Sequence, residues 1–87
     1  MNDWQPDSAQ TVKVLLFASL REQAGWSDRS IPLNALAVSS AREIWDRLEL
    51  GDLPQVVQVA INQEIVSADH PVHAGDELAF LPPFTGG

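Results

Sequence analysis

One capped amphipathic helix limits how this chain can fold more than any other feature. Ser40 and Glu43 have the spacing of a capping box, in which the serine oxygen accepts from the backbone of Glu43 while the glutamate reaches back. Gly51 stands where a helix C-cap is expected and Pro54 follows, so the helix should end after about three turns. The apolar side chains recur on one stripe: Ala41, Ile44, Trp45 and Leu48. Such a helix covers only one face of a sheet.

The first part of the chain favours strand, short helix, strand. Residues 11–18 are aliphatic on both faces, which predicts a central strand covered on both sides. Residues 19–24 suit one or two helical turns, with Ser19 as the N-cap and Gly25 as the stop. Pro32 interrupts a brief strand at 30–33 and indicates a sheet edge.

Strand patterns return after the main helix. Residues 56–61 alternate weakly, Asn62-Gln63 makes a tight turn, and residues 64–66 complete a hairpin. A loop at 67–76 leads to the last strand at 77–81. The simplest packing is a mixed sheet curled around the one main helix, an α+β domain of two layers. We expect a domain at 11–81 between a short N-terminal tail at 1–10 and an extended C-terminal tail at 82–87.

Length and charge exclude several functions. With 87 residues there is room for one core and no second lobe around a large active-site cleft. The absence of cysteine removes disulfides, thiolate metal sites and cysteine nucleophiles. A formal charge of −7 argues against nucleic acids and anionic membranes as partners. Nothing resembles a signal peptide or a membrane span, so a cytoplasmic location is expected.

The search for catalytic or metal-binding groups is mostly negative. There is no glycine-rich phosphate loop and no supported Ser/His pair. His70 and His73 flank Pro71 in a loop without a third ligand, so we expect exposed loop residues and no metal site. Trp45 belongs to the core, whereas Trp4 and Trp26 could lie in the core or in an interface.

The end of the chain is the feature that ordinary fraying explains least well. Pro82 and Pro83 remove two backbone donors and impose an extended course. Phe84 and Thr85 follow, and Gly86-Gly87 can pass through a narrow channel because glycine has no Cβ. The terminal carboxylate is ionised at neutral pH and therefore a poor electrophile until it is activated. An acyl adenylate would allow a sulfur nucleophile to form a thiocarboxylate, or an amine to form an amide.

Two segments resemble a known family. The ending GDELAFLPPFTGG is similar to that of the ubiquitin-like sulfur-carrier proteins. The segment VKVLLFASLREQAG resembles the small subunit of molybdopterin synthase, in which a strand ending in Phe-Ala leads into Leu-Arg-Glu. The thiamine sulfur carrier is similar at the tail but usually lacks that segment. Residues 1–10 lie outside the pattern, and Phe84-Thr85 stands where many members have an aliphatic residue and serine.

The resemblance implies a ubiquitin-like β-grasp fold and a sulfur-transferring subunit that is not catalytic alone. A separate activating enzyme would use ATP to adenylate Gly87, and a sulfur donor system would convert it to a thiocarboxylate. Within a heterotetramer with the large synthase subunit, the sulfur would pass to cyclic pyranopterin monophosphate and build the molybdopterin dithiolene. The chain itself would bind no cofactor. Residues 82–86 (Pro82, Pro83, Phe84, Thr85 and Gly86) would enter the partner.

Phe80, Leu81 and Phe84 are candidates for contacts near the tail, although Phe80 is better explained as core. Two other functions remain open at this point. The chain could carry sulfur for another pathway, such as thiamine or a tungsten pterin cofactor. It could also be a ubiquitin-like interaction module whose tail is never modified.

Overall fold

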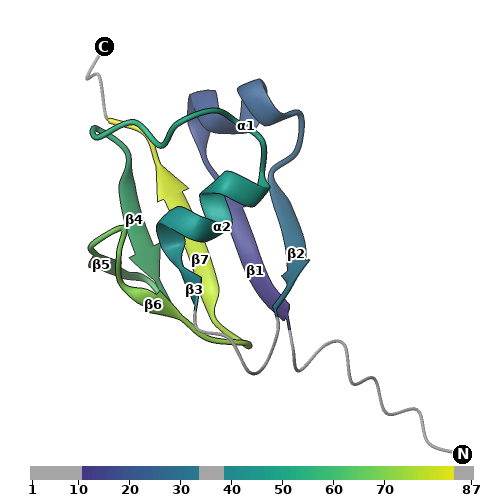
Figure 1. Ribbon diagram of the computed structural model, residues 1–87. Helices are drawn as coiled ribbons and strands as arrows, with labels where there is room; N and C mark the ends of the chain where they lie inside the picture. The colour runs from purple at the N-terminus through teal and green to yellow at the C-terminus, as the bar shows by residue number, and fades with distance from the viewer. Residues whose placement is uncertain (1–10, 34–38, 84–87) are drawn as a thin grey trace, which may run out of the picture.

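A five-stranded mixed sheet with one main helix on one face forms the domain (Figure 1). The structure is a computed structural model that describes residues 11–33 and 39–83. Its strand order is β2-β1-β7-β4-β5; β1 and β7 are parallel and the other neighbours antiparallel. A second, two-stranded sheet pairs β3 with β6. The elements are β1 (Thr11–Leu16), α1 (Ala18–Ala24), β2 (Asp28–Pro32), β3 (Ser39–Ser40), α2 (Ala41–Arg47), β4 (Gln58–Ile61), β5 (Glu64–Val66), β6 (Pro71–Val72) and β7 (Glu77–Leu81).

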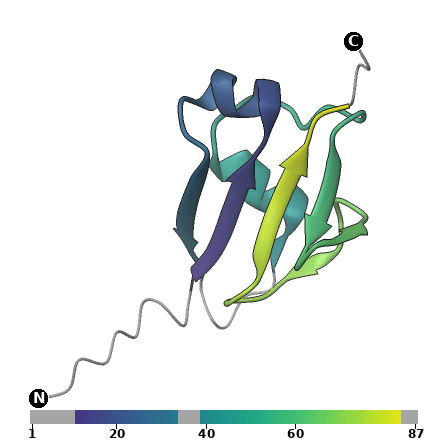
Figure 2. The same cartoon turned by 180° about the vertical axis from the view of Figure 1, so that it is seen from behind.

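The core lies between α2 and one face of the sheet. Trp45 and Ile44 of α2 are buried against alternate residues of the strands, because side chains of a strand point to opposite faces in turn. The strand residues of this core are Val12, Val14, Leu16, Val59, Ile61, Leu78 and Phe80. Among the described residues, no helix crosses the other face in Figure 2, where β1, β7 and β4 lie in front of α2. We call this other face the open face.

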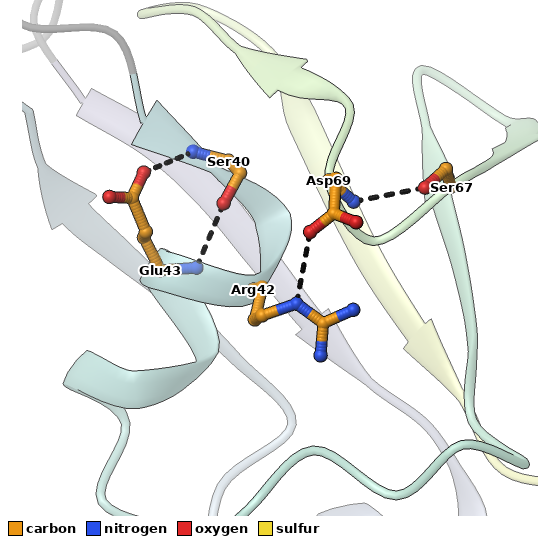
Figure 3. Close-up of polar contacts among 5 residues, drawn as sticks. All are labelled: Ser40, Arg42, Glu43, Ser67 and Asp69. Atoms are coloured by element: carbon orange, nitrogen blue, oxygen red, sulfur yellow. Dashed lines mark hydrogen bonds and ion pairs between the residues drawn. The ribbon is translucent and has the colours of Figure 1, made fainter.

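The predicted start of α2 is confirmed. The Glu43 backbone N–H donates to Ser40 Oγ at 3.2 Å, and the Ser40 N–H donates to Glu43 Oε1 at 2.8 Å (Figure 3). Next to this box, Arg42 forms an ion pair with Asp69 at 3.0 Å. The helix ends at Arg47, earlier than predicted. It stops because two residues close behind it, Glu49 (φ 60°) and Gly51 (φ 88°), are left-handed and turn the chain away from the helix axis.

Two predictions about β1 and α1 are wrong. β1 lies inside the sheet, between β2 and β7, as expected, but it is covered on one face only: Lys13 is exposed and Leu15 half-buried. A single main helix cannot cover both faces of the sheet, so the aliphatic content of residues 11–18 predicted more burial of β1 than the structure has. The N-cap of α1 is Phe17 and not Ser19, and it makes no side-chain capping bond. Gly25 closes the helix as predicted, in a left-handed conformation.

The remaining strands mostly follow the predictions. β2 is an edge strand that ends at Pro32, and Asn62 and Gln63 join β4 to β5 with positive φ at both turn residues. β4 begins at Gln58, two residues later than expected. The short pairing of β3 with β6 was not predicted, because two-residue strands carry no recognisable alternation. Within the described ranges, no helix is long and apolar enough to cross a bilayer.

A candidate docking site at the base of the C-terminal tail

The central strand of the sheet leads directly to the tail. β7 pairs with β1 on one side and β4 on the other, so its course is fixed up to Leu81. Pro82 and Pro83 follow it without strand structure. The predicted tail residues Phe84, Thr85, Gly86 and Gly87 lie outside the described residues. The part of the site that can be described is therefore the base from which the tail departs.

An apolar groove lies beside this base. It has a volume of about 720 Å³ and is formed where β1 passes into α1, where the chain enters β4, and where β7 ends. Phe17 and Val56 are among the large apolar side chains left exposed, at 41% and 62%. The groove is lined by Phe17, Ala18, Arg21, Val56, Gln58, Leu81, Pro82 and Pro83. We call it the tail groove; exposed apolar walls with a single cation suit contact with another protein.

Sequence reasoning assigned Phe17 to the first strand and missed its place in this groove. The chain leaves β1 at Leu16, and Ala18 adopts φ 51°, where the Leu20 N–H donates to the Phe17 carbonyl at 3.1 Å. This turn ends the strand before Phe17. Leu16 is in register with Phe80, which brings Phe17 beside Leu81. An apolar residue directly before a helical turn was the signal that could have indicated an exposed role.

The tail groove continues onto the open face through a row of apolar residues. The strand registers align Leu15, Ala79, Ala60 and Ile65 across β1, β7, β4 and β5. Ile65 is 61% exposed at the end of this row. The open face thus offers a partner an apolar row that begins at the tail groove and is most exposed at Ile65, since Ala60 is only 6% exposed.

The two candidate contact residues of β7 have different environments. Phe80 is fully buried, and its ring packs edge-on against Trp45 with centroids 4.9 Å apart. Phe80 therefore belongs to the core, as the sequence favours. Leu81 is half-buried and lines the tail groove, so it remains available to a partner.

Polar and aromatic side chains elsewhere in the described residues have structural partners. Asp76 accepts from the His73 backbone N–H at 2.8 Å and from the Asn62 side chain at 3.1 Å, so it ties the turn before β7 to the β4–β5 hairpin. His70 contacts the Pro71 carbonyl. Trp26, left open by the sequence, is half-buried against the core and lies 4.5 Å beneath the Arg29 guanidinium. Trp4 lies outside the described residues.

Comparison with known proteins decides the family. The family model described as "ThiS family" matches residues 14–87, which include the whole tail. The chain belongs to the ThiS family. This match and the solved structures below confirm the predicted resemblance and the ubiquitin-like β-grasp fold, a mixed sheet packed on one main helix.

Relatives of this ThiS-family chain include the molybdopterin synthase sulfur carrier subunit of Escherichia coli, 39% identical over 80 residues that cover 87% of this chain and 99% of that protein. Among solved structures, SAMP1 from Haloferax volcanii superposes with a TM-score of 0.74 at 27% identity, covering 88% of this chain and 99% of that one. A chain in the complex of subunits 1 and 2 of molybdopterin-converting factor from Helicobacter pylori has the same fold, with a TM-score of 0.61, 24% identity, and coverage of 88% and 99%.

Proposed function

We propose that this chain is the sulfur-carrying subunit of a molybdopterin synthase, with the carboxylate of Gly87 as its reactive group. The observation that carries the proposal is that the family match runs through Gly87, while β7 delivers the chain to Pro82 and Pro83 beside the tail groove. The name of the E. coli relative supports the same role.

The proposed reaction has three steps. A carboxylate oxygen of Gly87 attacks the α-phosphorus of ATP on a separate activating enzyme, and pyrophosphate leaves. Sulfide-level sulfur (HS⁻) delivered by a donor system then attacks the acyl carbon, AMP leaves, and loss of the S–H proton gives a thiocarboxylate. The thiocarboxylate sulfur attacks a carbon of cyclic pyranopterin monophosphate and displaces an oxygen substituent from it. Water then cleaves the acyl–sulfur bond, which restores the Gly87 carboxylate and leaves sulfur on the pterin, and a second thiocarboxylate supplies the other sulfur of the dithiolene.

The groups that bind substrate would come from the large synthase subunit, in a heterotetramer. The tail groove and the open face would dock against that subunit, with Leu81 and Phe17 at the contact and the tail reaching inward. The complex of two molybdopterin-converting factor subunits from H. pylori, which contains a chain of this fold, is consistent with such an assembly. An acidic chain also suits a large subunit that is basic where it holds a phosphorylated substrate.

Changing the length of the tail tests the proposal. Deleting Gly87, or adding one residue after it, should abolish molybdopterin formation in a reconstituted system. Adding one residue at the N-terminus is the matched control and should leave formation unchanged. The free energy of unfolding should stay within about 0.5 kcal/mol in all three variants, because terminal residues contribute little to stability. Molybdopterin formation by the shortened chain would refute the role of Gly87.

Pairing the thiocarboxylate form with different acceptors identifies the pathway. Sulfur should appear on the pterin when the molybdopterin synthase large subunit and cyclic pyranopterin monophosphate are supplied. Sulfur transfer only to the thiamine-forming system would assign the chain to the other branch of the family.

A further inference from the structure

The segment between α2 and β4 forms one wall of the tail groove. Residues 48–57 run from the end of the helix to the top of the sheet, and Val56 is the residue of this segment that lines the groove. Most of this length has no strand or helix to hold it. Its position therefore depends on the packing of Leu48, Leu50, Leu53 and Val57 against the core and on a few hydrogen bonds.

The Leu48 N–H donates to the Trp45 carbonyl at 2.9 Å where the helix ends, and three further hydrogen bonds hold the rest of the segment. Trp45 Nε1–H donates to the Gly51 carbonyl at 2.8 Å, and Gln23 Nε2–H donates to the Leu50 carbonyl at 3.3 Å. The Val57 N–H donates to the Pro54 carbonyl at 3.1 Å, directly beside Val56. The Trp45 bond is the shortest of the three. It comes from a side chain only 1% exposed, whose position is fixed by the core.

The same tryptophan also supports the opposite wall. Its ring packs edge-on against Phe80 at 4.9 Å, and Phe80 directly precedes Leu81, Pro82 and Pro83. Through its ring Trp45 holds the end of β7, and through its N–H it holds the segment that carries Val56. One buried side chain thus supports both walls, whose spacing within the sheet is set by the pairing of Gln58 with Leu81.

We infer that Trp45 is a positioning residue for partner docking: its indole N–H bond to Gly51 fixes the Val56 wall of the tail groove and so sets the affinity for the large subunit. The identity of the partner in this inference rests on the proposed function. Packing alone would need only the ring, which phenylalanine also supplies. The N–H is needed to hold the exposed carbonyl of Gly51.

Two substitutions perturb this bond in different ways. Trp45→Phe keeps an aromatic ring against Phe80 and deletes the donor. Gly51→Ala keeps Trp45 and strains the backbone at φ +88°, where a Cβ would meet no atom within 4 Å and the effect is therefore confined to the backbone. Ile44→Val is the matched control, because it loosens the same helix in the core and leaves the Trp45 N–H and the Gly51 backbone unchanged.

The first measurement needs no partner. Hydrogen exchange of the Val57 amide should accelerate in Trp45→Phe and Gly51→Ala relative to Ile44→Val, once each rate is corrected for global stability. Equal corrected rates in all three variants would overturn the inference. If Trp45→Phe fails to fold, Gly51→Ala carries the test.

The second measurement is calorimetric affinity for the large subunit of the same organism. We expect Kd to rise about fivefold in Trp45→Phe and Gly51→Ala, near the net value of one hydrogen bond, and to stay unchanged in Ile44→Val. If the unaltered chain binds and all three variants bind equally well, the inference alone is wrong. If the unaltered chain does not bind the large subunit, the proposed function fails and the docking role of Trp45 fails with it.

Discussion

Phe80 and Leu81 are neighbours in the chain but lie on opposite faces of β7. Phe80 is fully buried against Trp45, whereas Leu81 is half-buried in the tail groove. The sequence favours core for Phe80, because strand alternation places it with Leu78 on one face. It did not show what Leu81 faces, since that depends on Phe17 and Val56 arriving from distant parts of the chain.

Substitutions at these two positions should separate binding from stability. Leu81→Ala should weaken affinity for the large subunit about tenfold, as expected for an apolar anchor in an interface, and change the free energy of unfolding by less than about 1 kcal/mol. Phe80→Leu should lower the free energy of unfolding by about 1–2 kcal/mol through loss of the ring pair and imperfect repacking. Urea denaturation and calorimetry measure both quantities. A Leu81→Ala chain that binds like the unaltered protein would show that the tail groove is not a docking surface.

At the scale of elements, local signals were read correctly where the bonding is local. The capping box at Ser40 and Glu43 and the turn at Asn62-Gln63 involve residues at most three apart, and both are confirmed. The end of α2 follows from the left-handed residues Glu49 and Gly51, whereas the start of β4 and the pairing of β3 with β6 depend on contacts across the fold. The Ala41 N–H, for example, donates to the carbonyl of His70. Such partners cannot be inferred from a single segment.

The β4–β5 turn can be improved by one substitution. Gln63 has φ 73°, and Asn-Gly is the preferred pair for a two-residue hairpin turn in which both residues have positive φ. Gln63→Gly should therefore raise the free energy of unfolding by about 0.5–1 kcal/mol in urea denaturation. Glu64→Gly, in the adjoining strand, is the control and should lower it by a similar amount. A lower stability for Gln63→Gly would show that the turn is not strained at this residue.

At the scale of the whole molecule, the sequence predicted an α+β domain with one main helix, which is confirmed, and a reactive role for Gly87, which stays a prediction. The open face was missed, because the aliphatic content of residues 11–18 was taken as evidence for two covered faces. The apolar row across that face exists only in the assembled sheet, since Leu15, Ala79, Ala60 and Ile65 come from four strands. The register of the paired strands, and not the composition of any one segment, brings these four residues together.

The net charge makes a prediction about association kinetics. With 12 acidic and 5 basic side chains, the chain should be attracted over a distance to a basic large subunit. The association rate constant, measured by stopped flow, should therefore fall as NaCl is raised, while the dissociation rate changes little because the docking surface is apolar. An association rate independent of salt would contradict electrostatic steering.

The central claim is that sulfur travels on the carboxyl terminus. The most direct test is the intact mass of the chain after incubation with its activating enzyme, ATP and a sulfur donor, followed by fragmentation to locate the change. We predict a gain equal to the mass difference between one sulfur and one oxygen atom, confined to Gly87. A chain whose mass is unchanged, or whose added mass lies on a side chain, would contradict it.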